Sequence, residues 1–228
     1  VRTKLQASAS GQNMRKRQSP KRKKSMPKEQ EQKPKVKVQS VSHETESVEE
    51  HANVLFKPNE GPQTEFLAAS EREVLYGGSA GGGKSYAMLA DPLRYMGHPQ
   101  FSGLLLRHTT EELRELIFKS QELYPKIWPG IKWSERKMQW TAPSGARLWM
   151  SYLDRDEDVL RYQGLAFSWI GFDELTQWAT PYAWDYMRSR LRSTAPDLPI
   201  FMRATTNPGG RGHHWVKKMF IDPAAYNK

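Results

Sequence analysis

The chain has 228 residues, a formal charge of +10 at neutral pH and no cysteine, so it is long enough for one ordinary domain plus a tail. The lack of cysteine excludes disulfides and thiolate metal sites within this sequence. No window approaches the roughly 18 apolar residues that a membrane span requires, so we expect no membrane association.

The first 50 residues differ in composition from the rest of the chain. They carry 13 Lys and Arg against 6 Asp and Glu, with few large apolar side chains. Such a segment cannot bury enough surface to offset chain entropy, so we expect a disordered basic tail over residues 1–50 and one folded domain over 51–228. A basic tail on a mildly basic body suits nucleic-acid contact, although the tail taken alone fits a solubility segment equally well.

A glycine-rich motif near the start of the predicted domain indicates a phosphate site. Residues 78–85 read G-x-x-x-x-G-K-S, between an apolar run at 73–76 and a helix-forming stretch, which is the setting of a P-loop. Glycines let successive backbone N–H groups point at phosphate oxygens, and the helix N-terminus faces the same anion. Lys84 is expected to reach the β- and γ-phosphates, and Ser85 to hold Mg²⁺. The other expected nucleotide-binding positions of the loop are Gly78, Ser79, Ala80, Gly81, Gly82 and Gly83.

Apolar runs alternate with helix-like segments along the domain. Strands are predicted at 73–77, 102–107, 168–172 and 198–205, with a hairpin over 131–153. Helices are predicted at 64–70, 84–97, 109–123, 176–192 and 215–220. This alternation predicts an α/β fold with a mainly parallel sheet, whose ligands bind at the carboxyl ends of the strands.

An acidic pair, Asp173 and Glu174, follows the apolar strand predicted at 168–172. An aspartate in this position can hold the Mg²⁺ shared with Ser85, as in a Walker B motif. The adjacent glutamate suits a general base that orients the attacking water. Acidic residues are also favoured at a helix start for dipole reasons alone, but the location downstream of a P-loop favours the catalytic interpretation.

Further polar residues complete the candidate site. Thr205, Thr206 and Asn207 follow another apolar strand and could contact the γ-phosphate, or they could form an ordinary turn. The amide of Gln63 could pair with adenine. Since the P-loop contains no arginine, a cation for the transition state must come from elsewhere. The first candidate is Arg161, and the alternatives are Arg188, Arg190, Arg192 and Arg211.

Taken together, the motifs resemble the ATPase domain of the large terminase subunit of tailed double-stranded DNA bacteriophages. The matching strings are P-Q-T at 62–64, Y-G-G-S-A-G-G-G-K-S at 76–85, L-R-Y-Q-G at 160–164, I-G-F-D-E at 170–174, A-T-T-N-P at 204–208 and H-H-W-V at 213–216. The resemblance covers about residues 54–222. It implies a P-loop NTPase fold of the additional-strand, catalytic-glutamate type.

The resemblance also implies an activity and roles for individual residues. The expected activity is Mg²⁺-dependent ATP hydrolysis that drives DNA into a procapsid. Gln63 would read adenine, Asp173 would hold Mg²⁺, and Glu174 would be the catalytic base. Residues 205–207 match the family's coupling motif, and Arg161 matches an arginine that acts in trans across a ring of subunits.

The partners implied by the resemblance are double-stranded DNA, other copies of the chain, the portal protein and the small terminase subunit. The location would be the host cytoplasm, at the procapsid portal. The family's C-terminal nuclease domain has no counterpart in this sequence, so nuclease activity is not expected from the residues present. The alternatives are a helicase-like DNA-dependent ATPase, against which the sequence D-E-L-T at 173–176 argues, and a non-catalytic DNA-binding module with an inert P-loop.

Overall fold

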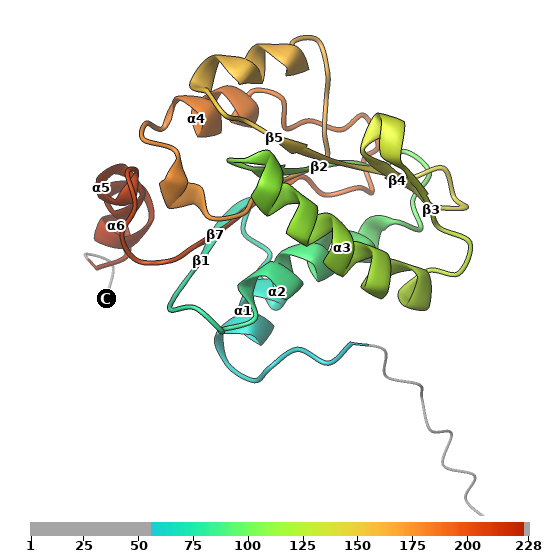
Figure 1. Cartoon of the computed structure of the whole chain (residues 1–228), viewed down its shortest axis with the longest axis horizontal. Coiled ribbons are helices and arrows are strands. Elements are labelled where there is room, and N and C mark those ends of the chain that lie inside the picture. Colours follow the sequence, from blue (N-terminus) through green and yellow to red (C-terminus); the bar gives the residue numbers. More distant parts are fainter. Residues whose placement is uncertain (1–55, 226–228) are drawn as a thin grey trace, which may run out of the picture. The chain divides into compact units, whose positions relative to one another are not determined.

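The computed structural model describes residues 56–225, which form a seven-stranded sheet in the order β1-β7-β6-β2-β5-β4-β3 (Figure 1). The parallel strands are β1 (Glu73–Gly77), β7 (Phe201–Thr206), β6 (Trp169–Phe172), β2 (Ser102–Arg107) and β5 (Arg147–Tyr152). The hairpin adds β4 (Gln139–Thr141) and then β3 (Lys132–Ser134) as antiparallel strands. The predicted α/β fold with a mainly parallel sheet is therefore confirmed. The tail predicted for 1–50 lies outside the described residues.

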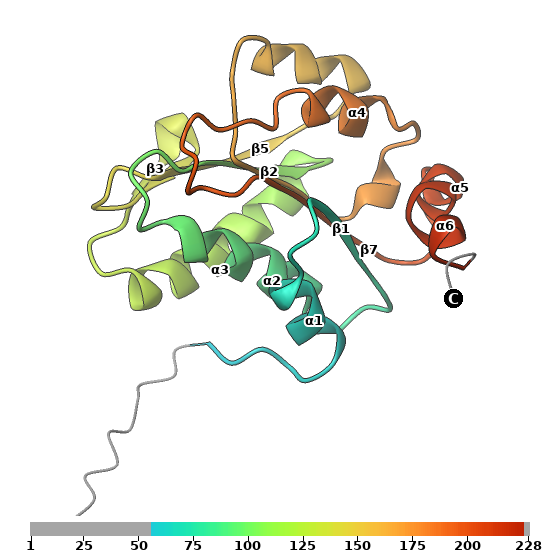
Figure 2. The ribbon, with the colours of Figure 1, turned by 180° about the vertical axis from the view of Figure 1, so that it is seen from behind.

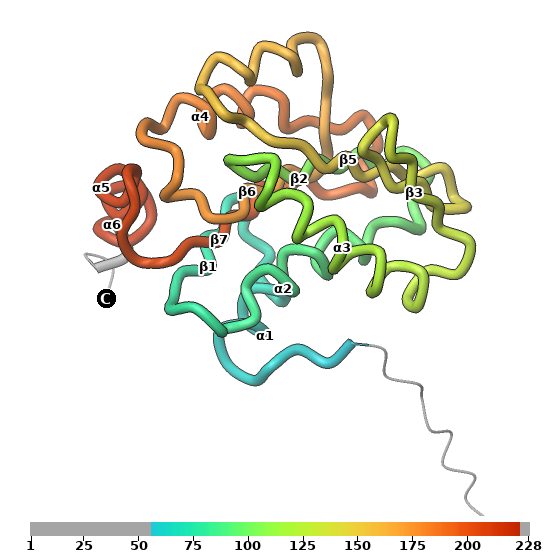
Figure 3. Tube along the Cα trace, viewed as in Figure 1, coloured from blue at the N-terminus to red at the C-terminus, as the bar shows by residue number. Residues whose placement is uncertain are grey.

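Strand β7 lies between β1, which leads into the P-loop, and β6, which leads into Asp173 (Figure 3). A strand inserted at this position is the additional strand that the resemblance implies. In the parallel register, Phe172 of β6 pairs with Leu106 of β2 on one side and with Ala204 of β7 on the other. The next residue along each strand is therefore brought to the same edge, where the site lies.

Helices cover both faces of the sheet (Figures 1 and 2). One face carries α1 (Pro62–Ala68), α2 (Lys84–Ala90), the 3₁₀ turn η1 (Asp91–Tyr95) and α3 (Thr110–Ile127). The other carries the 3₁₀ helix η3 (Asp156–Tyr162) and α4 (Tyr182–Arg188). The remaining short elements are η2 (Glu135–Lys137), η4 (Leu175–Gln177), α5 (His213–Val216), the π-helical η5 (Lys217–Ile221) and α6 (Asp222–Ala225). Within the described residues, no helix has the length and apolar character needed to cross a bilayer.

Each face of the sheet has its own apolar core because side chains alternate along a strand. On β2, Leu105 packs with the core of the α2 and α3 face, whereas Leu104 and Leu106 pack with the core of the opposite face. All three leucines are fully buried. Burial of a leucine side chain stabilises the fold by roughly 1.5 to 3 kcal/mol, so a buried central strand anchors both layers and fixes the edge that carries the site.

Two predicted helices are shorter than expected, and proline explains both differences. Between 176 and 192 the prediction was wrong over 178–181 and 189–192, because only η4 and α4 form, with Pro181 at the N-cap of α4. The helix predicted at 84–97 is α-helical only to Ala90 and continues as η1, since Pro92 has no N–H to donate within an α-helix. Conversely, α3 extends to Ile127, beyond the predicted end at 123.

Candidate nucleotide site

The P-loop connects β1 to α2 and encloses its own lysine. Gly78, Gly81 and Gly83 have φ values of 149°, 87° and 72°, which side chains with a Cβ rarely adopt. A Cβ at Gly83 would lie 2.7 Å from Nε2 of Gln63, so a larger residue there would have to displace the Gln63 amide. Lys84 Nζ donates to the carbonyls of Gly78 and Ser79, at 3.1 and 2.7 Å. The ammonium is thus held inside the loop, where an anion would replace the carbonyls as its partner.

Gln63 of α1 lies against the P-loop, as the adenine hypothesis requires. Its side chain is buried, its Nε2 donates to Gly83 O at 2.8 Å, and its Oε1 accepts from Asn59 N at 2.6 Å. Both edges of the amide therefore have partners within the chain. Pairing with adenine would exchange these two hydrogen bonds for two bonds to the base.

Asp173 is the centre of a row of polar side chains at the carboxyl ends of the strands. It is fully buried, and its Oδ2 lies 3.1 Å from Arg107 Nε and accepts from Ser85 Oγ at 3.5 Å. The Thr205 hydroxyl donates to Oδ1. A carboxylate and a hydroxyl that face each other are oxygen ligands of the kind Mg²⁺ prefers. Within the described residues there is no cluster of three or more His, Cys, Asp or Glu side chains that could hold a metal ion.

Glu174 is held in a strained backbone conformation by the residues around it. Its φ of 61° lies in the left-handed region, which costs a non-glycine residue about 1 kcal/mol. The Glu174 N–H donates to Thr205 Oγ1 at 3.1 Å. The carboxylate accepts from Asn207 N at 3.0 Å and from Asn207 Nδ2 at 2.7 Å. These bonds fix the Glu174 carboxylate, which lines the same cavity as the P-loop.

Burial raises the pKa of the Glu174 carboxyl, and the nearby charge of Asp173 raises it further. The hydrogen bond from Asn207 N–H and the charges of Arg107 and Lys84 act in the opposite direction. A carboxylate whose pKa is closer to neutral pH is a stronger base than an ordinary glutamate. The environment of Glu174 therefore suits proton abstraction from a water.

The three polar residues after β7 divide between different partners. Thr205 bonds to Asp173, and Asn207 bonds to Glu174. Thr206 Oγ1 instead donates to Thr176 Oγ1 at 2.7 Å, toward η4. Two of the three predicted residues therefore support the acidic pair directly, and the third links β7 to the segment that follows Glu174.

A cavity of about 500 Å³ joins the P-loop to Glu174 and Asn207. Its lining residues are Ala80, Gly81, Gly82, Gly83, Lys84, Ser85, Tyr86, Glu115, Lys119, Glu174 and Asn207. Glu115 and Lys119 come from α3 and were not predicted from the sequence. Another cavity, of about 460 Å³, lies at the amino ends of β2 and β6, and its Ser102 and Ser168 hydroxyls are bonded to backbone carbonyls. Of the predicted site residues, it is lined by the alternative arginine Arg192.

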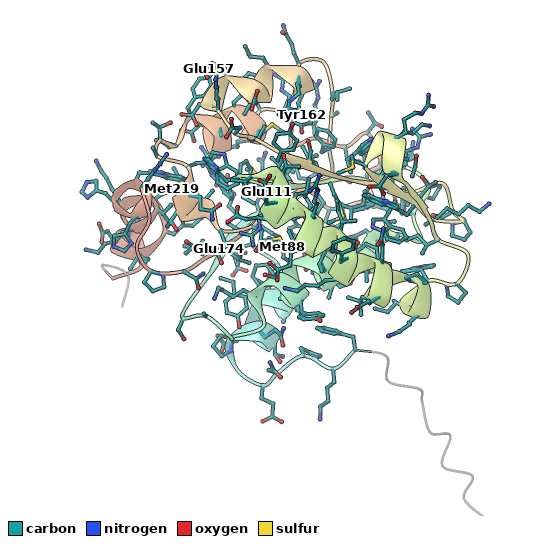
Figure 4. The ribbon with its side chains drawn as sticks, viewed as in Figure 1. Met88, Glu111, Glu157, Tyr162, Glu174 and Met219 are labelled. Carbon is teal, nitrogen blue, oxygen red and sulfur yellow. The ribbon has the colours of Figure 1, made fainter. Side chains whose placement is uncertain are left out.

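Arg161 does not line the nucleotide cavity of its own subunit. On η3, its Nη2 donates to Tyr152 O at 2.7 Å and its Nε donates to Asp158 O at 3.1 Å. Figure 4 shows Glu157 and Tyr162, which belong to the same helix, well separated from Glu174. The Arg161 side chain is 44% exposed, and its Nη2 lies 3.5 Å from Asp158 Oδ2.

The alternative arginines, like Arg161, do not line the nucleotide cavity of their own chain. Arg188 forms paired hydrogen bonds with Glu73, at the start of β1 and so at the opposite edge of the sheet. Arg192 lines the cavity at the amino ends of β2 and β6, and the guanidinium of Arg190 lies 5.4 Å from the ring centroid of Tyr186. Arg211 does not line the nucleotide cavity.

Arg107 is a site residue that the motifs did not indicate. It ends β2, is 8% exposed and forms an ion pair with Asp173, while its Nε and Nη1 have no hydrogen-bond partner within the described residues. The available signal was a charged residue at the end of an otherwise apolar strand, at the edge where the site was expected. A buried guanidinium beside the Walker B aspartate balances the charge of that carboxylate.

This fold and site define a P-loop NTPase domain of the additional-strand, catalytic-glutamate type. The family model of the phage terminase large subunit matches residues 70–228. The chain therefore belongs to the phage large terminase family, and the resemblance inferred from the motifs is confirmed.

Solved structures agree with this assignment at the level of the fold. The large terminase of a thermophilic bacteriophage is similar, with a TM-score of 0.58 and 17% identity, over 75% of this chain and 44% of that one. The same terminase in complex with ADP gives 0.56 and 17%, over 72% and 42%. The HK97 bacteriophage large terminase gives 0.53 and 13%, over 72% and 36%. The chain thus spans less than half the length of these terminases, and curated proteins gave no significant match.

Proposed function

We propose that the chain is the ATP-hydrolysing motor domain of a phage large terminase, which translocates double-stranded DNA into a procapsid. One observation carries the proposal: the P-loop and Glu174 line one cavity, and the buried Asp173 carboxylate lies behind it, where its Oδ2 accepts from Ser85 Oγ at 3.5 Å. A P-loop without an acidic pair would bind nucleotide and leave the reaction open. The adjoining glutamate supports hydrolysis.

Each residue of the site has a distinct role in the proposed reaction. Lys84 exchanges its two loop carbonyls for oxygens of the β- and γ-phosphates. Ser85 and Asp173 hold Mg²⁺, which when bound neutralises charge on the phosphates. Glu174 accepts a proton from the attacking water, and its bonds to Asn207 and Thr205 keep the carboxylate oriented. Gln63 recognises adenine, and the thermophilic phage terminase solved in complex with ADP supports an adenine nucleotide as the ligand.

Arg161 is proposed to act on the cavity of a neighbouring subunit. It lies outside the cavity of its own subunit and is partly exposed. Two carbonyls hold its guanidinium, and the Asp158 carboxylate lies 3.5 Å from its Nη2, so binding to a phosphate would exchange these partners for charge-assisted bonds to phosphate oxygens. A site completed in this way works only in an assembly. We therefore propose a ring of copies, with DNA, the portal protein and the small terminase subunit as further partners, in the host cytoplasm at the procapsid.

The test is ATP hydrolysis by the purified chain, with and without double-stranded DNA. The wild type is expected to hydrolyse ATP in a Mg²⁺-dependent reaction that DNA stimulates, and Lys84→Ala is expected to abolish both rates. Equal rates in the two proteins would sink the motor proposal, and strand displacement in the same preparation would favour a helicase instead.

Mixing variants tests the role of Arg161 in trans. Arg161→Ala keeps an intact P-loop and Glu174, whereas Glu174→Gln keeps Arg161. A mixture of the two is expected to hydrolyse ATP faster than either variant alone, because one kind of interface then combines a complete cavity with an arginine. If the mixture is no more active than the average of the two, the arginine does not act across subunits.

A further inference from the structure

Helix α3 is held rigidly beside the nucleotide cavity. Near its N-terminus, Gln177 Nε2 donates to Glu112 Oε1 at 2.6 Å, which links α3 to the segment after Glu174. Toward its C-terminus, the buried Tyr124 hydroxyl donates to Leu89 O of α2 at 2.9 Å. Two separate contacts therefore fix the position of α3, one to η4 after Glu174 and one to α2 after the P-loop.

Two oppositely charged residues of α3 line this cavity. Lys119 Nζ lies 2.5 Å from Glu115 Oε1 and 6.0 Å from the ring centroid of Tyr86, which follows the P-loop serine. Among the lining residues, Lys84 and Lys119 are the two cations. Lys84 is enclosed by the loop, whereas the Lys119 side chain is 29% exposed and its stem can rotate.

The present partner of Lys119 is weak compared with a phosphate chain. An exposed pair spaced four residues apart on a helix contributes little stability, and the Glu115 side chain is 63% exposed. The hydrogen bond from Lys119 lowers the pKa of the Glu115 carboxyl, so this group is ionised at neutral pH and repels phosphate. Phosphate oxygens carry more charge than one carboxylate and form stronger charge-assisted hydrogen bonds.

We propose that Lys119 binds the phosphate chain of the nucleotide in its own subunit, and that Glu115 holds the Lys119 ammonium until the nucleotide enters. The inference rests on the proposed function and assigns a phosphate-binding residue beyond the known motifs. The P-loop itself contains no arginine. Lys119 would supply the bound phosphates with a second cation after Lys84, from the same chain and independently of Arg161 from a neighbouring subunit.

Isothermal titration of the full chain with ATPγS tests the proposal. Lys119→Ala is expected to raise Kd about tenfold, which corresponds to ~1.4 kcal/mol, and Lys119→Arg to restore most of the affinity. Glu115→Gln is expected to lower Kd about two- to threefold, because it frees the ammonium and removes a repelling charge, and this gain should shrink at about 1 M salt. Lys126→Ala, on the same helix but outside the cavity, is the matched control and should change Kd less than about twofold.

Thermal melting of the unliganded proteins separates binding from helix stability, and none of these variants is expected to shift Tm by more than about 2 °C. A Lys119→Ala Kd within about twofold of wild type would overturn the proposal, as would weaker binding by Glu115→Gln. Lys84→Ala distinguishes the two levels of inference. The Lys119 assignment alone fails if the wild type and Lys119→Ala bind ATPγS equally well while Lys84→Ala does not bind it. If the wild type does not bind ATPγS at all, the proposed function itself fails.

Discussion

The ion pair between Arg107 and Asp173 gives a quantitative test of how the site is built. Both side chains are buried, at 8% and 0% exposure, and Arg107 Nε lies 3.1 Å from Asp173 Oδ2. Arg107→Met keeps most of the side-chain volume but leaves the carboxylate with two hydroxyl donors and no cation. Removing one partner of a buried pair costs about 3 to 5 kcal/mol, since the remaining charge is uncompensated.

The assay is urea unfolding of the chain without nucleotide, together with thermal melting. For a domain of this size, the expected loss corresponds to a fall in Tm of roughly 6 to 20 °C. Arg114→Met is the matched control, because this arginine is exposed on α3, and it should change stability by less than about 0.5 kcal/mol.

A double variant separates the charge effect from packing. Asp173→Asn removes the charge that Arg107 balances, so the combination of Arg107→Met with Asp173→Asn should cost less than the sum of the two single changes, by about 1 to 3 kcal/mol. Additive losses, or an Arg107→Met protein within about 0.5 kcal/mol of wild type, would refute the electrostatic reasoning.

Two further predictions concern the site itself. Asn207→Ala keeps the backbone N–H bond to Glu174 but removes the Nδ2 donor that favours the ionised carboxylate. The pKa of Glu174 should therefore rise, and the acidic limb of the ATPase pH profile should move to higher pH; an unmoved limb would count against Glu174 as the base. Gly83→Ala places a Cβ against Gln63 at a φ of 72°, so it should raise the Kd for ATPγS at least about tenfold in a titration. The control is Gly145→Ala, which changes a glycine with a φ of 95° in the β4–β5 turn and should leave Kd unchanged.

The parts of the molecule that could be predicted from the sequence are those fixed by local patterns. The P-loop and the acidic pair each follow an apolar run, and the ends of parallel strands meet at one edge, so Lys84, Ser85, Asp173 and Glu174 could be placed together. The separate fates of Thr205 and Thr206 could not be predicted, because they depend on which face of β7 each side chain occupies.

The residues missed from the sequence depend on contacts between distant segments. Arg107 joins the site because the register of β2 and β6 aligns position 107 with position 173. Lys119 and Glu115 join it because α3 packs against α2, and nothing in their i, i+4 spacing distinguishes them from an ordinary exposed pair. Pro181 lies inside the helix predicted at 176–192, and α4 begins only after this proline.

The most direct test of the central claim is to measure ATP binding and ATP hydrolysis on the same sample of the Glu174→Gln variant. The claim is that this carboxylate is the base of an ATP-hydrolysing site, and not a structural cap. The variant is expected to bind ATP·Mg²⁺ with a Kd within about threefold of wild type and to lose at least ~100-fold in single-turnover hydrolysis in the presence of DNA. Hydrolysis at the wild-type rate by a variant that binds ATP normally would contradict the account.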